Sequence, residues 1–321
     1  MMQAIQVKEF GAPEVMQIQE VATPVPVRGQ VKVDVKAVGV NPVDTYIRAG
    51  IYPLKPELPY IPGNDAAGII SAVGPDVKHR QVGDRVYVFG SLVGSYAEQL
   101  VCSENQVFKL PEKTDFSVGA AIGVPYTTAF YGLLYRAHAL PGETVLIHGA
   151  SGAVGQAAVQ IAHSYGLRVI GTAGTAAGIK LLQEQGVVAA LNHHDENYLD
   201  AVDELTCGMG ADVILEMLAN VNLDKDLKIV AKYGRIVVIG NRGTIEINPR
   251  DTMGKNASIL GMAAFNASPA EFRQIHAVVH AGLQDGRFKP TIRTELPLRS
   301  APEAHKLVME PGGNGKIILI P

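Results

Sequence analysis

The sequence has no tryptophan, and its 321 residues include only two cysteines, eight phenylalanines and no surplus of positive charge. Cys102 and Cys207 lie too far apart to form a metal-binding knuckle, and they predict no disulfide framework. A formal net charge of −3 argues against a general nucleic-acid binder, since no excess of cations is present to displace counterions. The length predicts two domains, and 34 glycines favour an α/β protein with many tight connections.

Long uninterrupted apolar runs are also missing. The first ten residues, MMQAIQVKEF, contain no apolar core of signal-peptide length, so we do not expect secretion. Residues 116–135 carry no charge, but Pro125 and three glycines interrupt them, which suits a buried domain junction better than a membrane span. We therefore expect a cytoplasmic protein in a reducing compartment, without a membrane segment.

The first third of the chain has the pattern of β-structure. Val31, Val33 and Val35 alternate with charged residues, which is the period of a half-buried strand. Short apolar runs at 67–73, 85–89 and 106–110 follow, separated by glycine. Prolines interrupt the helical alternatives around them. This part predicts a compact sheet or partial barrel.

The middle third alternates strands with helices. An apolar face recurs at spacings of three and four over residues 154–165, as in an amphipathic helix. Together with the helical segments between the strands, the pattern indicates parallel βαβ units. A helix is expected at 269–281, and a last strand at 316–320 is expected to return to the first domain. The strands predicted in the middle third are 145–148, 168–171, 189–192, 212–216, 235–239 and 258–261.

A glycine loop joins the first of these strands to the first helix. Residues 145–162 read VLIHGASGAVGQAAVQIA, with Gly149, Gly152 and Gly155 in the turn and Ala150 where the strict pattern has glycine. Small residues let the backbone approach a pyrophosphate, and the helix N-terminus offers free N–H groups. A tight turn alone would explain the glycines, but strand, loop and helix together predict dinucleotide binding.

The stretch after the loop bears on the choice of dinucleotide. NAD-binding domains usually carry an acid about 20 residues beyond the glycines, where it accepts from the ribose hydroxyls. Residues 169–180 contain no acid, so a 2′-phosphate would meet no repulsion there. Lys180 and His193 are candidates for its positive charge, although a lone lysine more often faces solvent. The sequence favours NADP as the cofactor.

Several further motifs occur in order along nearly the whole chain, and together they resemble the medium-chain dehydrogenase/reductase superfamily. Within it they look like the zinc-free quinone oxidoreductases of the ζ-crystallin type. The resemblance implies an α/β fold with a GroES-like, β-rich catalytic domain at 1–123 and 265–321. It also implies a doubly wound parallel-sheet Rossmann domain that binds NADP at 124–264. The motifs are residues 41–50 (NPVDTYIRAG), 62–68 (PGNDAAG), 82–86 (VGDRV), 148–155 (HGASGAVG), 216–223 (EMLANVNL) and 242–251 (RGTIEINPRD).

The resemblance also implies that no metal is bound. Zinc-dependent members of the superfamily use cysteine and histidine ligands and a four-cysteine structural site. Asn41 stands where such members have a ligand cysteine, and Asn64 and Asp65 stand where they have a His-Glu pair. Two cysteines cannot build the structural site, so we expect no zinc.

The same likeness implies a set of site residues. Tyr46 and Tyr52, in and beside the first motif, are the expected catalytic residues on the substrate side, and Tyr46 is also expected to contact the cofactor. Some departures exist, since Asn241 and residues 262–264 differ in side chain from the family's pattern. The other expected cofactor-binding residues are Ser151, Gly152, Ala153, Val154, Gly174, His193, Asn222, Ile239, Gly240, Asn241, Arg242, Met262, Ala263 and Ala264.

The implied activity is NADPH-dependent reduction of ortho- or para-quinones in an interdomain cleft, by hydride transfer or by one-electron steps through a semiquinone. Hydride transfer depends mainly on positioning. One alternative is reduction of the double bond of an alkenal or enone on the same scaffold. Another is an AU-rich RNA-binding or lens structural protein with secondary enzyme activity, which the charge supports little. Relatives suggest a homodimer or homotetramer, with strand 258–261 extending a sheet between subunits.

Overall fold

The computed structural model describes residues 1–321, and their contacts divide the chain into two compact units. Unit 1 comprises Met1–Val124 and His276–Pro321, and unit 2 comprises Pro125–Ile275. The second boundary falls inside helix α9 (Pro269–Gln284), beyond residue 264, where the sequence analysis ended the nucleotide-binding domain. The His276 ring of this helix stacks on Phe108 of unit 1, with ring centroids 3.5 Å apart, which explains the later boundary.

Unit 1 is mainly β-structure. Its seven-stranded sheet has the order β14-β15-β3-β4-β5-β7, with β6 paired to β3, and β1 and β2 form a separate antiparallel pair. The elements are β1 (Met2–Val7), η1 (Pro13–Val15), β2 (Met16–Val21), β3 (Gln30–Val40), α1 (Pro42–Arg48), β4 (Asp65–Val73), β5 (Arg85–Phe89), β6 (Gln99–Ser103), η2 (Glu104–Gln106), β7 (Val107–Lys109), α2 (Phe116–Ala120), β14 (Ile292–Pro297), η5 (Leu298–Ser300), α10 (Ala301–Leu307) and β15 (Lys316–Ile320).

The alternating valines of β3 form the centre of this sheet. Val31 and Val33 are fully buried and Val35 nearly so, while the charged residues between them are at least partly exposed. The last strand, β15, pairs antiparallel with β3, so the C-terminal segment returns to the first unit, as the sequence predicts. This pairing brings residues from both ends of the chain into one hydrophobic core.

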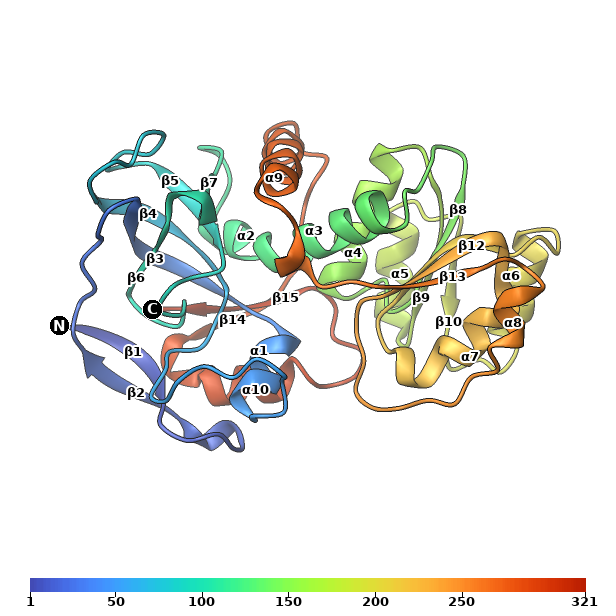
Figure 1. Cartoon of the computed structure of the whole chain (residues 1–321), viewed down its shortest axis with the longest axis horizontal. Coiled ribbons are helices and arrows are strands. Elements are labelled where there is room, and N and C mark those ends of the chain that lie inside the picture. Colours follow the sequence, from blue (N-terminus) through green and yellow to red (C-terminus); the bar gives the residue numbers. More distant parts are fainter. The chain divides into compact units, whose positions relative to one another are not determined.

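Unit 2 is a parallel α/β structure of the doubly wound class, as predicted. Its six-stranded sheet has the order β10-β9-β8-β11-β12-β13, and every pair in it is parallel. Figure 1 shows α4 and α5 on one side of these strands and α6 and α7 on the other. The elements are β8 (Thr144–Ile147), α4 (Ala153–Ser164), β9 (Arg168–Ala173), α5 (Ala176–Glu184), β10 (Ala189–Asn192), α6 (Tyr198–Leu205), β11 (Ala211–Glu216), α7 (Ala219–Ile229), β12 (Val230–Val238), α8 (Arg250–Met253), β13 (Ser258–Gly261) and η4 (Ala264–Asn266).

The charge-free stretch 116–135 contains the first boundary between the units. It forms α2, α3 (Gly123–Phe130) and most of a short π-helical turn, η3 (Tyr131–Arg136). Two residues separate α2 from α3, whereas η3 continues α3 without a break. None of the helices in the structure has the length and apolar character that a membrane crossing requires.

Candidate functional site

The carboxyl ends of the strands in unit 2 gather the expected cofactor residues along one edge of the sheet. Because all strand pairs are parallel, every strand ends at that edge, and residues that follow successive strands become neighbours. The strand order reverses between β8 and β11, and ligands of open α/β sheets bind at such a switch point. The expected residues follow β8 (151–154), β9 (Gly174), β10 (His193), β11 (Asn222), β12 (239–242) and β13 (262–264).

The glycine loop between β8 and α4 is fixed by hydrogen bonds from its backbone to β9. Gly149 has a φ of +56°, and its N–H donates to the hydroxyl of Thr172 on β9 over 3.1 Å. The N–H of Ala150 donates to the Thr172 carbonyl over 2.7 Å. A Cβ at Gly155 would lie 2.5 Å from the carbonyl oxygen of Gly149, so only glycine fits there. No side chain caps the N-terminus of α4, which suits a pyrophosphate group.

The end of β9 carries imidazoles where NAD-binding domains carry an acid. A Cβ at Gly174 would lie 2.7 Å from Nε2 of His193 and 2.8 Å from Nε2 of His194. The two rings meet edge to face, with centroids 4.6 Å apart. Partial desolvation lowers the pKa of His193, and the neighbouring His194 lowers it further. Lys180, the other sequence candidate, is 77% exposed and pairs with Glu184 at 3.8 Å.

The turns after β11 and β12 are tied to one another. The backbone N–H groups of Ile239 and Gly240 both donate to the carbonyl of Glu216, at 2.9 and 3.2 Å. The Asn222 side chain donates to Glu216 Oε1 over 3.2 Å. Arg242 N donates to the side-chain oxygen of Asn220 over 2.8 Å. These bonds bring together four residues that the sequence assigned to the cofactor only by resemblance, Asn222, Ile239, Gly240 and Arg242.

The turn after β13 joins the same edge. Met262 N donates to the carbonyl of Val238, at the end of β12, over 3.2 Å. The side chains of Ile239 and Met262 both face Gly132, where a Cβ would lie 3.6 and 3.8 Å from their terminal carbons. The Asn241 side chain turns back to the carbonyl of Gly243 over 2.7 Å. The aliphatic pair gives this part of the edge an apolar lining.

The two expected catalytic tyrosines lie in unit 1. Tyr46 is on α1, whose first turn is closed by reciprocal hydrogen bonds between Asn41 and Asp44. The backbone N–H groups of Ile51 and Tyr52 both donate to the carbonyl of Tyr46, at 3.1 and 3.3 Å. The structure thus brings the backbones of Tyr46 and Tyr52 together, and both side chains are partly exposed.

The same unit holds a buried polar network that includes Asn41, Asn64 and Asp65, the residues from which the sequence analysis expected no zinc. The ammonium group of Lys316 donates to Asn41 Oδ1 over 2.5 Å and to Asp65 Oδ2 over 2.8 Å. Asp65 is fully buried, Lys316 is 2% exposed, and the other oxygen of Asp65 accepts from Val124 N over 2.7 Å. Asn64 donates to Asp44 over 3.1 Å. The charge of Asp65 is therefore balanced by an ammonium group of the chain itself.

A cavity of about 870 Å³ in unit 1 reaches this network. Asp44, Tyr60 and Asn64 line it, together with apolar residues that include Ile47 and Leu54. Burial raises the pKa of Asp44 to about 6. Neither of the two expected catalytic tyrosines lines this cavity.

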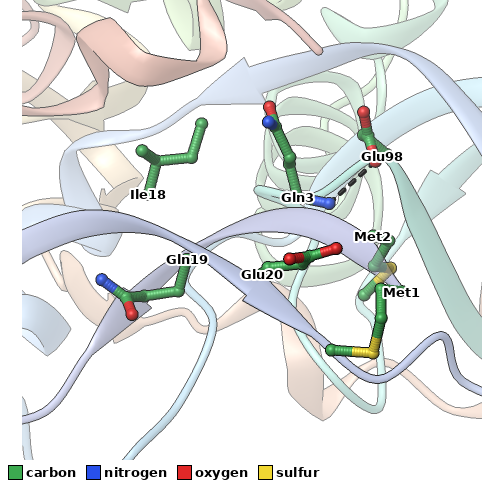
Figure 2. Close-up of a pocket in the computed structure, with 7 residues that line it drawn as sticks. All are labelled: Met1, Met2, Gln3, Ile18, Gln19, Glu20 and Glu98. Atoms are coloured by element: carbon green, nitrogen blue, oxygen red, sulfur yellow. Dashed lines mark hydrogen bonds between the residues drawn. The ribbon is translucent and has the colours of Figure 1, made fainter.

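A second, smaller cavity, of about 320 Å³, lies beside β1 and β2. Figure 2 shows its lining, in which Gln3 N donates to the carboxylate of Glu98 over 2.8 Å. None of the expected site residues is among those that line it. We assign it no part in the site.

Sequence reasoning missed three parts of this arrangement. Thr172 lies within a strand, Lys316 is 251 residues from Asp65 in sequence, and His194 stands next to a histidine already chosen. Only His194 had a local signal, since the 2′-phosphate argument that selected His193 applies equally to its neighbour.

The parallel sheet with its glycine loop, together with the β-rich unit, defines a nicotinamide-dinucleotide oxidoreductase of the medium-chain dehydrogenase/reductase type. Family models describe residues 27–112 as an alcohol dehydrogenase GroES-like domain and residues 153–281 as a zinc-binding dehydrogenase domain.

Relatives and solved structures cover the whole chain. The quinone oxidoreductase of Homo sapiens is 48% identical over 322 residues, covering 100% of this chain and 98% of that protein. A quinone oxidoreductase structure from Pseudomonas syringae has a TM-score of 0.92 at 29% identity, covering 100% of both chains. The Escherichia coli quinone oxidoreductase complexed with NADPH has a TM-score of 0.91 at 29% identity, covering 99% of this chain and 100% of that one. The chain belongs to the quinone oxidoreductase family.

Proposed function

We propose that the protein reduces quinones with NADPH, acting on ortho- or para-quinones. The observation that carries this proposal is the carboxyl edge of the parallel sheet in unit 2, where the residues expected to bind a dinucleotide follow all six strands. The human and bacterial relatives named quinone oxidoreductases, one of them complexed with NADPH, support the activity and the cofactor.

Residues 124–264 form the proposed NADP-binding domain. The glycine loop at 151–154 faces the pyrophosphate, with its backbone fixed by Thr172. Gly174 leaves room at the end of β9, and His193 can supply an N–H donor there for a 2′-phosphate. Asn222 and the turns 239–242 and 262–264 hold the nicotinamide half. No acid at the end of β9 opposes the phosphate, so NADPH is preferred over NADH.

Hydride transfer to a quinone depends mainly on how the side chains position the two reactants. NADPH, when bound, supplies the reducing equivalents. Tyr46 and Tyr52 are the proposed proton donors on the substrate side, because the two residues lie on one turn that the Tyr46 carbonyl closes and both side chains are partly exposed. The apolar pair Ile239 and Met262 gives an apolar lining to the edge of the sheet that is proposed to hold the nicotinamide.

The proposal needs no metal ion. Asn41 and Asp65 stand at the superfamily's zinc-ligand positions, and both already accept hydrogen bonds from the Lys316 ammonium group. A divalent cation would have to displace that buried charge. The residues present therefore fit a metal-independent enzyme.

Assembly and location are proposed on separate observations. Strand β13 is an edge strand of its sheet with Ser258 and Gly261 exposed, so it can pair across a two-fold axis, and we propose a homodimer or homotetramer. Light scattering that finds only monomer contradicts this. Both cysteines are free, which supports a reducing, cytoplasmic location.

Steady-state oxidation of NADPH tests the function. Purified protein is given an ortho-naphthoquinone, a para-benzoquinone and a 2-alkenal in turn, each with NADPH and with NADH. We expect turnover of quinones, with preference for NADPH, and a lower kcat for Tyr46→Phe. Turnover of the alkenal alone would replace the proposal with enone reduction. Absence of all turnover, with an RNA mobility shift that NADPH reverses, would replace it with RNA binding.

A further inference from the structure

A closed cluster of three titratable side chains lies directly beneath the proposed cofactor surface. His148 follows β8, Glu216 ends β11, and Asp226 is on α7. Glu216 and Asp226 are fully buried, and His148 is 3% exposed. His148 Nε2 lies 2.8 Å from Asp226 Oδ1 and 3.5 Å from Glu216 Oε2.

If both carboxyls of this cluster are ionised, they have more acceptor oxygens than there are hydrogen-bond donors nearby. Glu216 Oε1 accepts from the Leu218 N–H and from Asn222, and Asp226 Oδ1 accepts from His148. One oxygen on each carboxyl, Glu216 Oε2 and Asp226 Oδ2, has no hydrogen-bond donor. A carboxyl oxygen of Glu216 and one of Asp226 lie within 4.8 Å of each other in this buried cluster, so two ionised carboxylates would repel strongly, whereas a single proton shared by them removes one charge and supplies the missing donor.

The charged and titratable groups around Glu216 and Asp226 affect how strongly the two carboxyls hold a proton. Burial raises the pKa of both Glu216 and Asp226 and lowers the pKa of His148, so the imidazole is neutral and donates one N–H. Lys225, also on α7, favours ionisation of Asp226. Tyr198 of α6 meets His148 edge to face, and His193 is the next imidazole beyond it. None of these groups neutralises both carboxylates.

Glu216 also forms hydrogen bonds with several of the residues expected to bind the cofactor. Its side chain fixes Asn222 and the start of α7, and its carbonyl fixes Ile239 and Gly240. His148 immediately precedes the glycine loop. A shift of the Glu216 carboxyl would therefore move Asn222 directly.

We propose that Glu216 and Asp226 share one proton, and that the singly protonated pair is a positioning device which holds Asn222 for the dinucleotide. Loss of the proton places a second negative charge beneath an anionic cofactor and drives the carboxyls apart. Affinity for both NADPH and NADH then falls as pH rises. The inference rests on the proposed function for its ligand, but the shared proton is a property of the free protein.

The decisive variant is Glu216→Gln. Its amide oxygen keeps the bonds to Leu218 and Asn222, and its NH₂ group donates to Asp226, so it imitates the protonated pair at every pH. Glu246→Gln, at an exposed glutamate, is the matched control. Dissociation constants for NADPH and NADH are measured by fluorescence titration from about pH 6 to about pH 9.

We expect wild type and Glu246→Gln to lose about tenfold in affinity for each added unit of pH once the proton is released, and Glu216→Gln to stay nearly flat. Asn222→Ala should bind weakly at all pH values, and adding it to Glu216→Gln should give the same profile as Asn222→Ala alone. A decline confined to NADPH would belong to His193 and His194 at the 2′-phosphate and would overturn the proposal. So would identical profiles for wild type and Glu216→Gln.

Thermal unfolding without cofactor separates this inference from the proposed function. Wild type should lose stability relative to Glu216→Gln as pH rises from about 4 to about 7, because only its folded state keeps the extra proton. If wild type binds neither dinucleotide but shows this difference, the function fails and the shared proton stands. If one equivalent of Zn²⁺ or Mn²⁺ raises the Tm of wild type but not of Glu216→Gln, a cation rather than a proton holds the pair, and the inference is wrong.

Discussion

Replacement of Lys316 by methionine tests the buried network of unit 1. Methionine keeps most of the apolar stem but removes the ammonium group from Asn41 and Asp65, which leaves a fully buried carboxylate whose remaining donors are Asn41 Nδ2 at 3.0 Å and Val124 N at 2.7 Å. Removal of one partner from a buried ion pair costs about 3–5 kcal/mol, because the other charge stays behind without compensation. We expect Lys316→Met to lose stability by that amount in unit 1.

Hydrogen exchange with mass spectrometry measures this loss where it occurs. Peptides that cover β3 and β15, which pair through Ile317–Leu319, should exchange about 10² to 10⁴ times faster than in wild type, since each 1.4 kcal/mol is about a factor of ten. Lys113→Met, at an exposed lysine, is the control and should leave these peptides unchanged.

The double variant Asp65→Asn with Lys316→Met distinguishes charge from shape. It removes both charges, so it should be less destabilised than Lys316→Met alone, although the same methionine is present in both. The account of Lys316 as the counter-charge of Asp65 is refuted by either of two results. One is a free energy of unfolding for Lys316→Met within about 1 kcal/mol of the wild-type value, and the other is a double variant that is less stable than Lys316→Met.

Other contacts lead to three further predictions. Gly155→Ala should weaken NADPH binding by at least about tenfold, since its Cβ would press within 2.5 Å of the Gly149 carbonyl, and a fluorescence titration measures this. Thr172→Val removes the hydroxyl that accepts from the loop N–H and should cost about 1 kcal/mol, or about fivefold in affinity, whereas Thr172→Ser should not. Burial lowers the pKa of His276 and of His305 to about 3, so the folded state resists protonation that the unfolded state accepts below about pH 6.5. The free energy of unfolding should therefore decrease as the pH falls below about 6.5, and at about pH 5 each histidine should account for a loss of about 2 kcal/mol. Urea unfolding at several pH values checks this, because His305→Gln should lose less stability in acid than wild type.

The sequence predicts the nucleotide-binding unit well because its signals are local. Strands β10, β13 and β15 occupy the predicted residues, and the glycine loop lies between a buried strand and an amphipathic helix as expected. Strand β12 starts at Val230, earlier than the predicted 235, and its register against β11 shifts between Val230 and Arg235, where Tyr233 takes a left-handed conformation.

The contacts that hold the site had no such signal. Lys316 contacts Asp65 because β15 pairs with β3, and no local sequence pattern near either residue predicts this ion pair. Thr172 resembles any other strand residue, yet its hydroxyl and carbonyl fix the loop on the neighbouring strand. The register between strands, which the sequence does not specify residue by residue, decides both contacts.

Buried carboxylates are neutralised in two different ways in the two units, and this difference has a measurable consequence. In unit 1 the charge of Asp65 meets the ammonium group of Lys316 at 2.8 Å. In unit 2 the pair Glu216 and Asp226 has no comparable cation and depends on a proton that neutral solution can remove. Lys316 lowers the pKa of Asp44, which burial raises to about 6, so the cost of Lys316→Met should vary with pH around that value and level off above about pH 8, whereas the effect of Glu216→Gln should change up to about pH 9. A cost of Lys316→Met that keeps changing above about pH 8 would mean that a group other than Asp44 in the network of unit 1 holds an exchangeable proton.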